Sequence, residues 1–243
     1  MSAIITKIDP RSPAEKAGLQ VGETLLTIGG RAIRDVLDYK FYTYDPQLIL
    51  EVQGKDGAKR AVKIRKHEGQ DLGLEFETYL MDAQKGCANR CVFCFIDQLP
   101  RGMRKSLYFK DDDARLSFLL GNYITMTNLS DEDADRIVRM KISPLNISVH
   151  TTDPELRTKM LGNPNGGSSL RHLEAFAKAG VKIHAQVVAC PGWNDGDQLK
   201  KTLADLSAMY PSVESVAVVP VGITRHREGL TPLTPVGEQE ARD

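Results

Sequence analysis

Residues 86–94 read GCANRCVFC, which places Cys87, Cys91 and Cys94 in the spacing C-x3-C-x2-C. Cysteine thiolates are the usual protein ligands of iron–sulfur clusters. A cubane cluster has four irons, so three local thiolates leave one iron without a local protein ligand. An open position of this kind distinguishes a reactive metal site from a closed structural one. The stretch therefore predicts a cluster with one iron free to bind a small chelating ligand.

Two other uses of these cysteines compete with a cluster. A structural zinc ion would take Cys190 as a distant fourth ligand, but zinc motifs usually bring two close ligand pairs and the second pair is missing here. A disulfide framework needs an oxidising compartment and a small fold. The spacing favours the cluster over both. Phe93, directly before the third cysteine, suits a ring that lies against a cofactor and equally one that packs in the core.

The composition is that of an ordinary globular protein. The chain has 243 residues, of which 41% are hydrophobic and 26% charged, and its formal net charge is zero. This balance gives no electrostatic reason to expect nucleic acid as a partner. The sequence has no apolar run of membrane-spanning length, and the N-terminus lacks the charged and apolar regions of a signal peptide. With three of its four cysteines clustered, the chain is expected in the reducing cytoplasm.

Residues 1–72 predict a small α+β domain. Ser12 caps a short helix that begins at Pro13, Glu15 completes a capping box, and Gly18 ends the helix. Strands are expected at 4–8, 21–30, 48–52 and 61–65, with a helix at 35–44. The residues expected in the core are Ile4, Ile8, Leu19, Leu25, Ile28, Leu50 and Val62.

The order of these segments resembles the PDZ domain. A PDZ domain usually begins with a strand that carries a Gly-Leu-Gly-Phe-like carboxylate loop, and no such strand precedes Ile4. Residues 72–76, Leu-Gly-Leu-Glu-Phe, follow the last hairpin and are interpreted as a permuted substitute for that strand. That strand would receive a peptide by β-augmentation. Peptide binding and docking onto the second domain remain equal alternatives for this module.

Residues 73–243 predict a partial parallel (β/α) barrel, because strands and helices alternate. The expected strands are 76–82, 123–127, 145–149, 181–189 and 215–219. Five strands fall short of a closed barrel, and Thr234-Pro235 opens a helix that the sequence ends within. We therefore expect the chain to be the N-terminal part of a longer protein.

Ligands of parallel α/β sheets bind beyond the carboxyl ends of the strands. The unusual residues of this chain follow the predicted strand ends and so converge on one site. They are the cysteine stretch 86–94, Thr127-Asn128, residues 150–153, residues 190–194 and residues 221–226.

Several stretches together resemble one family. The cysteine spacing is that of the radical SAM enzymes, and residues 97–104, 110–113, 116–122, 148–152 and 161–163 are similar to an uncharacterised bacterial family. That family joins a PDZ-like module to a radical SAM barrel and a C-terminal domain of unknown function. The resemblance covers essentially the whole chain.

The resemblance implies a [4Fe–4S] cluster on Cys87, Cys91 and Cys94, with S-adenosylmethionine on the fourth iron. It also implies a 5′-deoxyadenosyl radical that abstracts hydrogen from an unidentified substrate, with a peptide or a protein among the candidates. An electron donor such as a flavodoxin or a ferredoxin is expected. The Gly-Gly-Glu of many superfamily members is replaced here by residues 125–128. The candidate cofactor-binding residues are Phe93, Thr127, Asn128, His150 and Gln186.

Two other functions remain open at this point. One is a PDZ-type adaptor with a structural zinc site, and the other is a non-catalytic iron–sulfur sensor. Asp111-Asp112-Asp113 is interpreted as a solvated helix start rather than a magnesium triad. Cys190 has three candidate roles, as a metal ligand, a radical-quenching thiol or a packed core residue, and packing is the favoured one.

Overall fold

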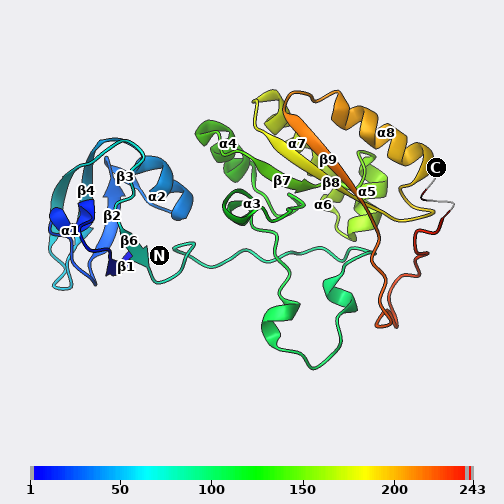
Figure 1. Ribbon diagram of the computed structural model, residues 1–243, viewed down its shortest axis with the longest axis horizontal. Coiled ribbons are helices and arrows are strands. Elements are labelled where there is room, and N and C mark those ends of the chain that lie inside the picture. The colour runs from blue at the N-terminus through cyan, green and yellow to red at the C-terminus, as the bar shows by residue number, and fades with distance from the viewer. Residues whose placement is uncertain (1–2, 239–240, 242–243) are drawn as a thin grey trace. The chain divides into compact units, whose positions relative to one another are not determined.

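The computed structural model describes residues 3–238 and residue 241. Its contacts divide the chain into two compact units, Met1–Gln84 and Lys85–Asp243 (Figure 1). The sequence analysis placed the boundary between residues 72 and 73. The structure keeps Leu74–Phe76 in the first unit, because this strand pairs with the first strand of the chain.

The first unit is a mainly antiparallel sheet with two helices, which confirms the small β-rich domain. The strand order is β5-β4-β2-β1-β6, and β3 pairs with β2. The elements are β1 (Ala3–Ile8), α1 (Pro13–Lys16), β2 (Thr24–Ile28), β3 (Arg31–Ala32), α2 (Val36–Tyr42), β4 (Gln47–Gln53), β5 (Lys59–Arg65) and β6 (Leu74–Phe76).

Local sequence signals explain most of these elements. The Ser12 side chain accepts a hydrogen bond from the Glu15 backbone N–H and so caps α1, as predicted. The Glu15 carboxylate accepts from the Arg11 N–H at 2.6 Å, one residue earlier than a capping box requires. Gly29 and Gly30 have φ of +58° and +75°, and this left-handed pair makes the turn between β2 and β3.

The predicted core of this unit is correct at five of seven positions. Ile4 and Ile8 are half-buried instead, whereas Ile5 is fully buried. The inward positions of β1 are therefore Ala3 and Ile5, and the pairing of β1 with β6 shifts its register after Ile5. The confirmed core residues are Leu19, Leu25, Ile28, Leu50 and Val62.

The predicted substitute strand after the last hairpin is present. β6 pairs antiparallel with β1 at the edge of the sheet. Gly73 precedes it with φ of +76°, and a Cβ there would lie 2.4 Å from the Ser12 Cβ. The expectation that residues 76–82 form the first barrel strand is wrong, because residues 77–82 form bends and turns.

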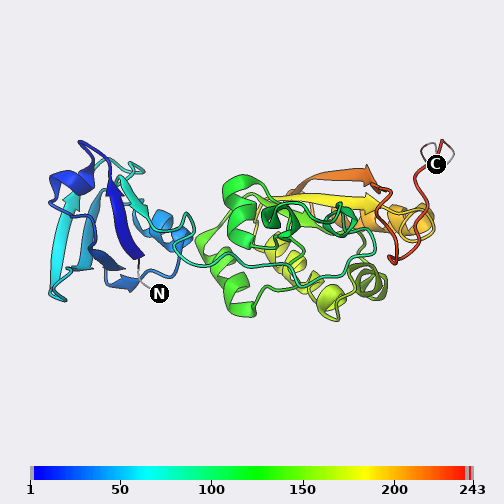
Figure 2. The same ribbon diagram turned by 90° about the horizontal axis from the view of Figure 1, so that it is seen from below.

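The second unit holds a parallel sheet of order β7-β8-β9. The strands β8 and β9 lie side by side in both views (Figures 1 and 2). The elements are η1 (Ile96–Gln98), η2 (Lys105–Tyr108), α3 (Ala114–Leu120), α4 (Asp131–Met140), β7 (Leu145–Ser148), α5 (Pro154–Leu161), α6 (Asn165–Ser168), α7 (Leu170–Lys178), β8 (Ile183–Ala189), α8 (Gly196–Ser207) and β9 (Val213–Pro220).

Three of the five predicted barrel strands are confirmed as β7, β8 and β9. The strand expected at 123–127 is reduced to a single parallel bridge between Ile124 and Ile147. Across the residues that the structure describes, the parallel sheet thus has three strands, and they do not form a barrel.

The end of the chain was expected to be helical from Pro235. Residues 235–237 have no regular structure, and most of the remaining predicted helix lies outside the described residues. Within 3–238 and 241, none of the helices combines the length and apolar character needed to cross a bilayer.

Candidate functional site

The cysteine stretch is a loop whose backbone is held on two sides. On one side, the Cys87 N–H donates to the Lys110 carbonyl at 2.8 Å, next to a bridge between Gly86 and Asp111. On the other side, the Arg90 and Val92 N–H groups each donate at 2.9 Å to the last turn of α5. The position of the loop is therefore set by the fold rather than by the loop alone.

The three thiols of this loop are near enough for Cys87 and Cys94 to act electrostatically on Cys91. Cys87, Cys91 and Cys94 are all half-buried. Burial raises the pKa of the Cys91 thiol to about 12, and the neighbouring Cys94 and Cys87 add to that rise. Lys110 lies beside Cys94 and forms an ion pair of 2.7 Å with Asp97. Across 3–238 and 241, no three His, Cys, Asp or Glu side chains are grouped so as to hold one metal ion.

A buried polar network lies against the loop at Asn89. The Asn89 amide donates to the Thr125 hydroxyl at 2.8 Å, and its oxygen accepts from Thr127 at 2.9 Å and from Asn163 at 2.7 Å. The buried Asp112 carboxylate accepts from both the N–H and the hydroxyl of Thr125, each at 2.6 Å. The network therefore restricts the conformation of Asn89, which lies between the first two cysteines.

The predicted contacts Thr127 and Asn128 both act on the loop in this structure. Thr127 is buried, and its hydroxyl donates to Asn89. The Asn128 amide donates to the carbonyls of Gly86 and Asp112, both at 3.1 Å. The Thr127 donor is therefore used by the Asn89 side chain, and the Asn128 donors are used by the backbone carbonyls of Gly86 and Asp112.

The structure brings Phe93 and His150 together. Their ring centroids are 4.5 Å apart, and Phe93 also packs on a core cluster that contains Met160 and Cys190. His150 is buried at the end of β7 with φ of +63°, a conformation that is strained for a non-glycine residue. The Val188 N–H donates to its Nδ1 at 3.2 Å. We infer that the proton of the neutral ring is on Nε2.

His150 stays neutral in the folded protein. Burial, helped by the nearby Arg157, lowers its pKa to about 3. In the unfolded chain a His has a pKa of about 6.5, so the unfolded state binds the proton first as the pH is lowered. The free energy of unfolding therefore decreases as the pH falls from about 6.5 to about 3.

This difference predicts a pH-dependent effect of His150→Asn. Asparagine tolerates a positive φ and keeps an acceptor near the Nδ1 position. Between pH 7 and pH 5, the wild-type protein is expected to lose about 2 kcal/mol more free energy of unfolding than the variant. Urea unfolding followed by tryptophan fluorescence at both pH values measures this difference. Equal losses in the two proteins would show that folding does not lower the pKa of His150.

Gln186 lies on the face of the sheet that is turned toward Phe93. Ile183, Ala185 and Val187 of β8 are fully buried, so Gln186 and Val188 point to the opposite side. Val188 packs against the cluster that includes Phe93 and Cys190. The period-two argument that selected Gln186 is consistent with this placement.

Arg157 is a buried cation beneath the site, and the sequence analysis did not find it. Its guanidinium donates to the Val149 carbonyl at 2.9 Å and to the Ser169 hydroxyl at 2.5 Å. It also donates to the carbonyls of Thr125, Ser148 and Gly166, so five acceptors match its five N–H groups. Burial lowers its pKa to about 10, which leaves it charged at neutral pH.

The burial of side chains decides two further interpretations, those of the acidic run at residues 111–113 and of Cys190. The acidic run is not solvated, since Asp112 and Asp113 are 2% and 1% exposed and Asp113 pairs with the buried Arg115 at 2.6 Å. Cys190 is fully buried with Met160 and Val221. Burial raises the pKa of the Cys190 thiol to about 12, and the charged neighbours acting on it are Arg227 and Asp195. Its position is that of a packed core residue.

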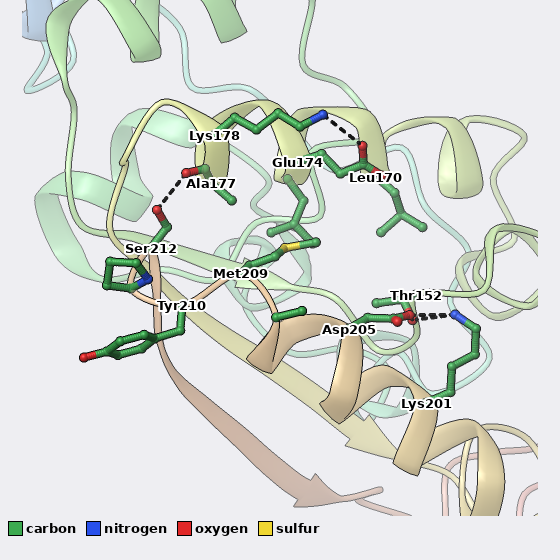
Figure 3. Close-up of a pocket in the computed structure, with 13 residues that line it drawn as sticks. Thr152, Leu170, Glu174, Ala177, Lys178, Lys201, Asp205, Met209, Tyr210 and Ser212 are labelled. Carbon is green, nitrogen blue, oxygen red and sulfur yellow. Dashed lines mark hydrogen bonds and ion pairs between the residues drawn. The ribbon is translucent and has the colours of Figure 1, made fainter.

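A cavity of about 650 Å³ lies away from the cysteine loop, between α7 and α8 (Figure 3). The charged side chains on its rim pair with each other. Lys201 contacts Asp205 at 2.6 Å, and Lys178 contacts Glu174 at 3.8 Å. We assign no ligand to this cavity.

Comparison with known proteins places both units. The radical SAM-like domain family matches residues 66–216, and the PDZ domain family matches residues 4–54. No curated protein matches the chain. Among solved structures, the PDZ domain of the SdrC-like protein from Listeria innocua is similar at 13% identity and a TM-score of 0.29. The match covers 34% of this chain and 100% of that one.

The radical SAM-like match spans more than half of the 243 residues and contains the whole cysteine loop, the Asn89 network, His150 and Arg157. It is preceded by the PDZ domain match, which contains strands β2 to β4 and nearly all of β1 of the first unit's sheet. The protein therefore belongs to the radical SAM-like domain family.

Proposed function

We propose that the protein is a radical SAM enzyme, in which Cys87, Cys91 and Cys94 bind a [4Fe–4S] cluster and S-adenosylmethionine occupies its fourth iron. In this proposal the parallel sheet is part of a (β/α) barrel of radical SAM type. Once bound, the cluster and S-adenosylmethionine would supply radical chemistry that takes a hydrogen atom from the substrate, with the electron coming from an external reductant.

The observation that carries this proposal is the separation of the cysteines into three and one. The three loop cysteines are all half-buried, and the charges of Cys94 and Cys87 add to the rise that burial gives to the pKa of the Cys91 thiol. The fourth, Cys190, is packed among apolar side chains and has other charged neighbours. Three thiolates on a loop held from both sides suit a cluster that keeps one iron open. A closed zinc site with Cys190 as the fourth ligand does not suit this arrangement.

The protein's own groups have distinct proposed roles. Phe93 and His150 form an apolar wall beside the loop, from which the His150 Nε2–H can donate a hydrogen bond to S-adenosylmethionine. Gln186 offers an amide from the same face of the sheet. Thr127 and Asn128 are proposed to act through the loop backbone and Asn89 rather than by contacting the cofactor. The proposed reductant is a flavodoxin or a ferredoxin.

Anaerobic reconstitution tests this proposal in two stages. The protein is expected to take up about four irons per chain, with the broad visible absorption of an iron–sulfur cluster. On reduction with S-adenosylmethionine present, it is expected to release 5′-deoxyadenosine, which mass spectrometry detects. Zinc uptake without iron would support the adaptor instead, and a cluster without 5′-deoxyadenosine would support a non-catalytic sensor.

A second candidate activity is peptide binding by the PDZ domain. β6 is an edge strand of its sheet. The rings of Phe76 and Tyr39 of α2 pack edge to face, with 5.1 Å between their centroids. A peptide could therefore add to β6 beside α2 by β-augmentation. Fluorescence anisotropy of labelled peptides with apolar carboxyl-terminal residues, with Tyr39→Ala for comparison, measures this activity.

A further inference from the structure

The end of α5 forms hydrogen bonds with the cysteine loop on both sides of Cys91. The last carbonyls of a helix have no partner inside the helix and need one from elsewhere. Here the Met160 carbonyl accepts from the Val92 N–H and the Leu161 carbonyl accepts from the Arg90 N–H, both at 2.9 Å. Both neighbours of Cys91 in the chain are therefore hydrogen-bonded to the end of α5.

Gly162 makes this close approach possible. It ends α5 in the left-handed conformation, with φ of +56°. A Cβ at this position would lie 2.5 Å from the Arg90 oxygen and 3.1 Å from the Arg90 carbonyl carbon. Backbone atoms cannot yield as a flexible side chain does, so any larger residue must push the loop away from the helix.

Asn163 extends the same contact to the first cysteine. It is buried, its amide donates to the Asn89 oxygen at 2.7 Å, and its own oxygen accepts from the Asn165 N–H at 2.9 Å. Asn89 in turn lies two residues after Cys87 in the loop, and its amide is held by the Thr125 hydroxyl at 2.8 Å. Asn163 therefore helps to position the loop segment next to Cys87 by way of Asn89.

We propose that Met160–Asn163, which we name the α5 clamp, is a positioning device that sets the spacing of Cys87, Cys91 and Cys94 before the cluster binds. The α5 clamp rests on the proposed function for its purpose, and its contacts are protein hydrogen bonds that do not involve the three thiols. It reduces the conformational freedom that the loop would otherwise lose on binding. Disturbing it is expected to make the cluster labile while the rest of the fold is kept.

The test compares Gly162→Ala with Gly180→Ala. Both glycines follow a helix of the second unit and have positive φ, of +56° and +75°, so alanine is strained at either position. A Cβ at Gly180 meets nothing within 4 Å, whereas a Cβ at Gly162 meets the loop. Gly162→Ala is expected to lose iron to a chelator about tenfold faster than Gly180→Ala. Equal rates in the two variants would overturn the proposal.

A second variant distinguishes an effect on the loop from a general loss of folding. Asn163→Asp keeps the acceptor for Asn165 but places an oxygen against the Asn89 oxygen. It is expected to lose iron faster than the wild-type protein, with a far-ultraviolet circular dichroism spectrum unchanged. Wild-type iron retention in this variant would count against the α5 clamp.

A readout without metal separates this inference from the proposed function. In the metal-free protein, Gly162→Ala is expected to speed alkylation of Cys91 by iodoacetamide, mapped by mass spectrometry, and Gly180→Ala is not. A wild-type protein that takes up no iron would overturn the proposed function, and alkylation would still decide the α5 clamp. Unchanged alkylation in Gly162→Ala would overturn the clamp whether or not iron binds.

Discussion

Replacing Arg157 with methionine is expected to lower the free energy of unfolding of the second unit by about 4 kcal/mol or more. The substitution removes five N–H donors from buried acceptors at the end of β7, at the Thr125 carbonyl and around α6. It also leaves the buried Asp112 carboxylate without the cation whose charge acts on it. Each buried polar group left without a partner costs about 1–3 kcal/mol.

Urea unfolding followed by fluorescence measures this loss selectively, because the one tryptophan of the chain, Trp193, lies in the second unit. Arg171→Met is the matched control, since Arg171 makes an exposed ion pair with Asp131 at 2.8 Å. Exposed pairs contribute about 1 kcal/mol or less. If Arg157→Met costs no more than this control, water replaces the guanidinium and the buried network is not a support of the fold.

Single substitutions of Cys87, Cys91 or Cys94 by alanine are expected to abolish cluster binding. Each thiolate is proposed to be one of only three protein ligands, so its loss leaves two of the four irons without a protein bond. Iron content after anaerobic reconstitution is expected to fall from about four per chain to near zero, together with the visible absorption.

Cys190→Ala is the control for these three variants. Cys190 packs against Met160 and Val221, and its removal is expected to leave iron content and 5′-deoxyadenosine release unchanged. Full iron retention in any of the three loop variants would refute the ligand assignment. Equal metal loss in all four variants would favour a closed, structural metal site.

Much of the first unit was predictable because its signals are local. Ser12 and Pro13 mark a helix start, and Gly29-Gly30 marks a tight turn between β2 and β3. The inward face of β1 was not predictable, since Ile4, Ile5 and Ile8 are equally apolar. Pairing with β2 and β6 decided which of them is buried.

In the second unit, the long apolar strand β8 and its neighbours β7 and β9 were visible in the sequence. Leu74–Phe76 of the first unit was identified through the resemblance to a PDZ domain rather than from a local pattern, and it pairs with β1. Residues 123–127 have a strand-like pattern but make only one bridge. The side chains of Thr125 and Thr127 are used by Asp112 and Asn89 instead.

By itself, the sequence determined the spacing of the three cysteines, the caps and turns, and the apolar strands, because these depend on residues a few positions apart. The tertiary structure decided which groups support the site. Arg157 and the acidic residues 111–113 have the pattern of solvated charges, and only the fold buries Arg157 and Asp112 beneath the loop. Gly162 meets Arg90 for the same reason. A contact between residues tens of positions apart exists only after the chain has packed, so no local pattern encodes it.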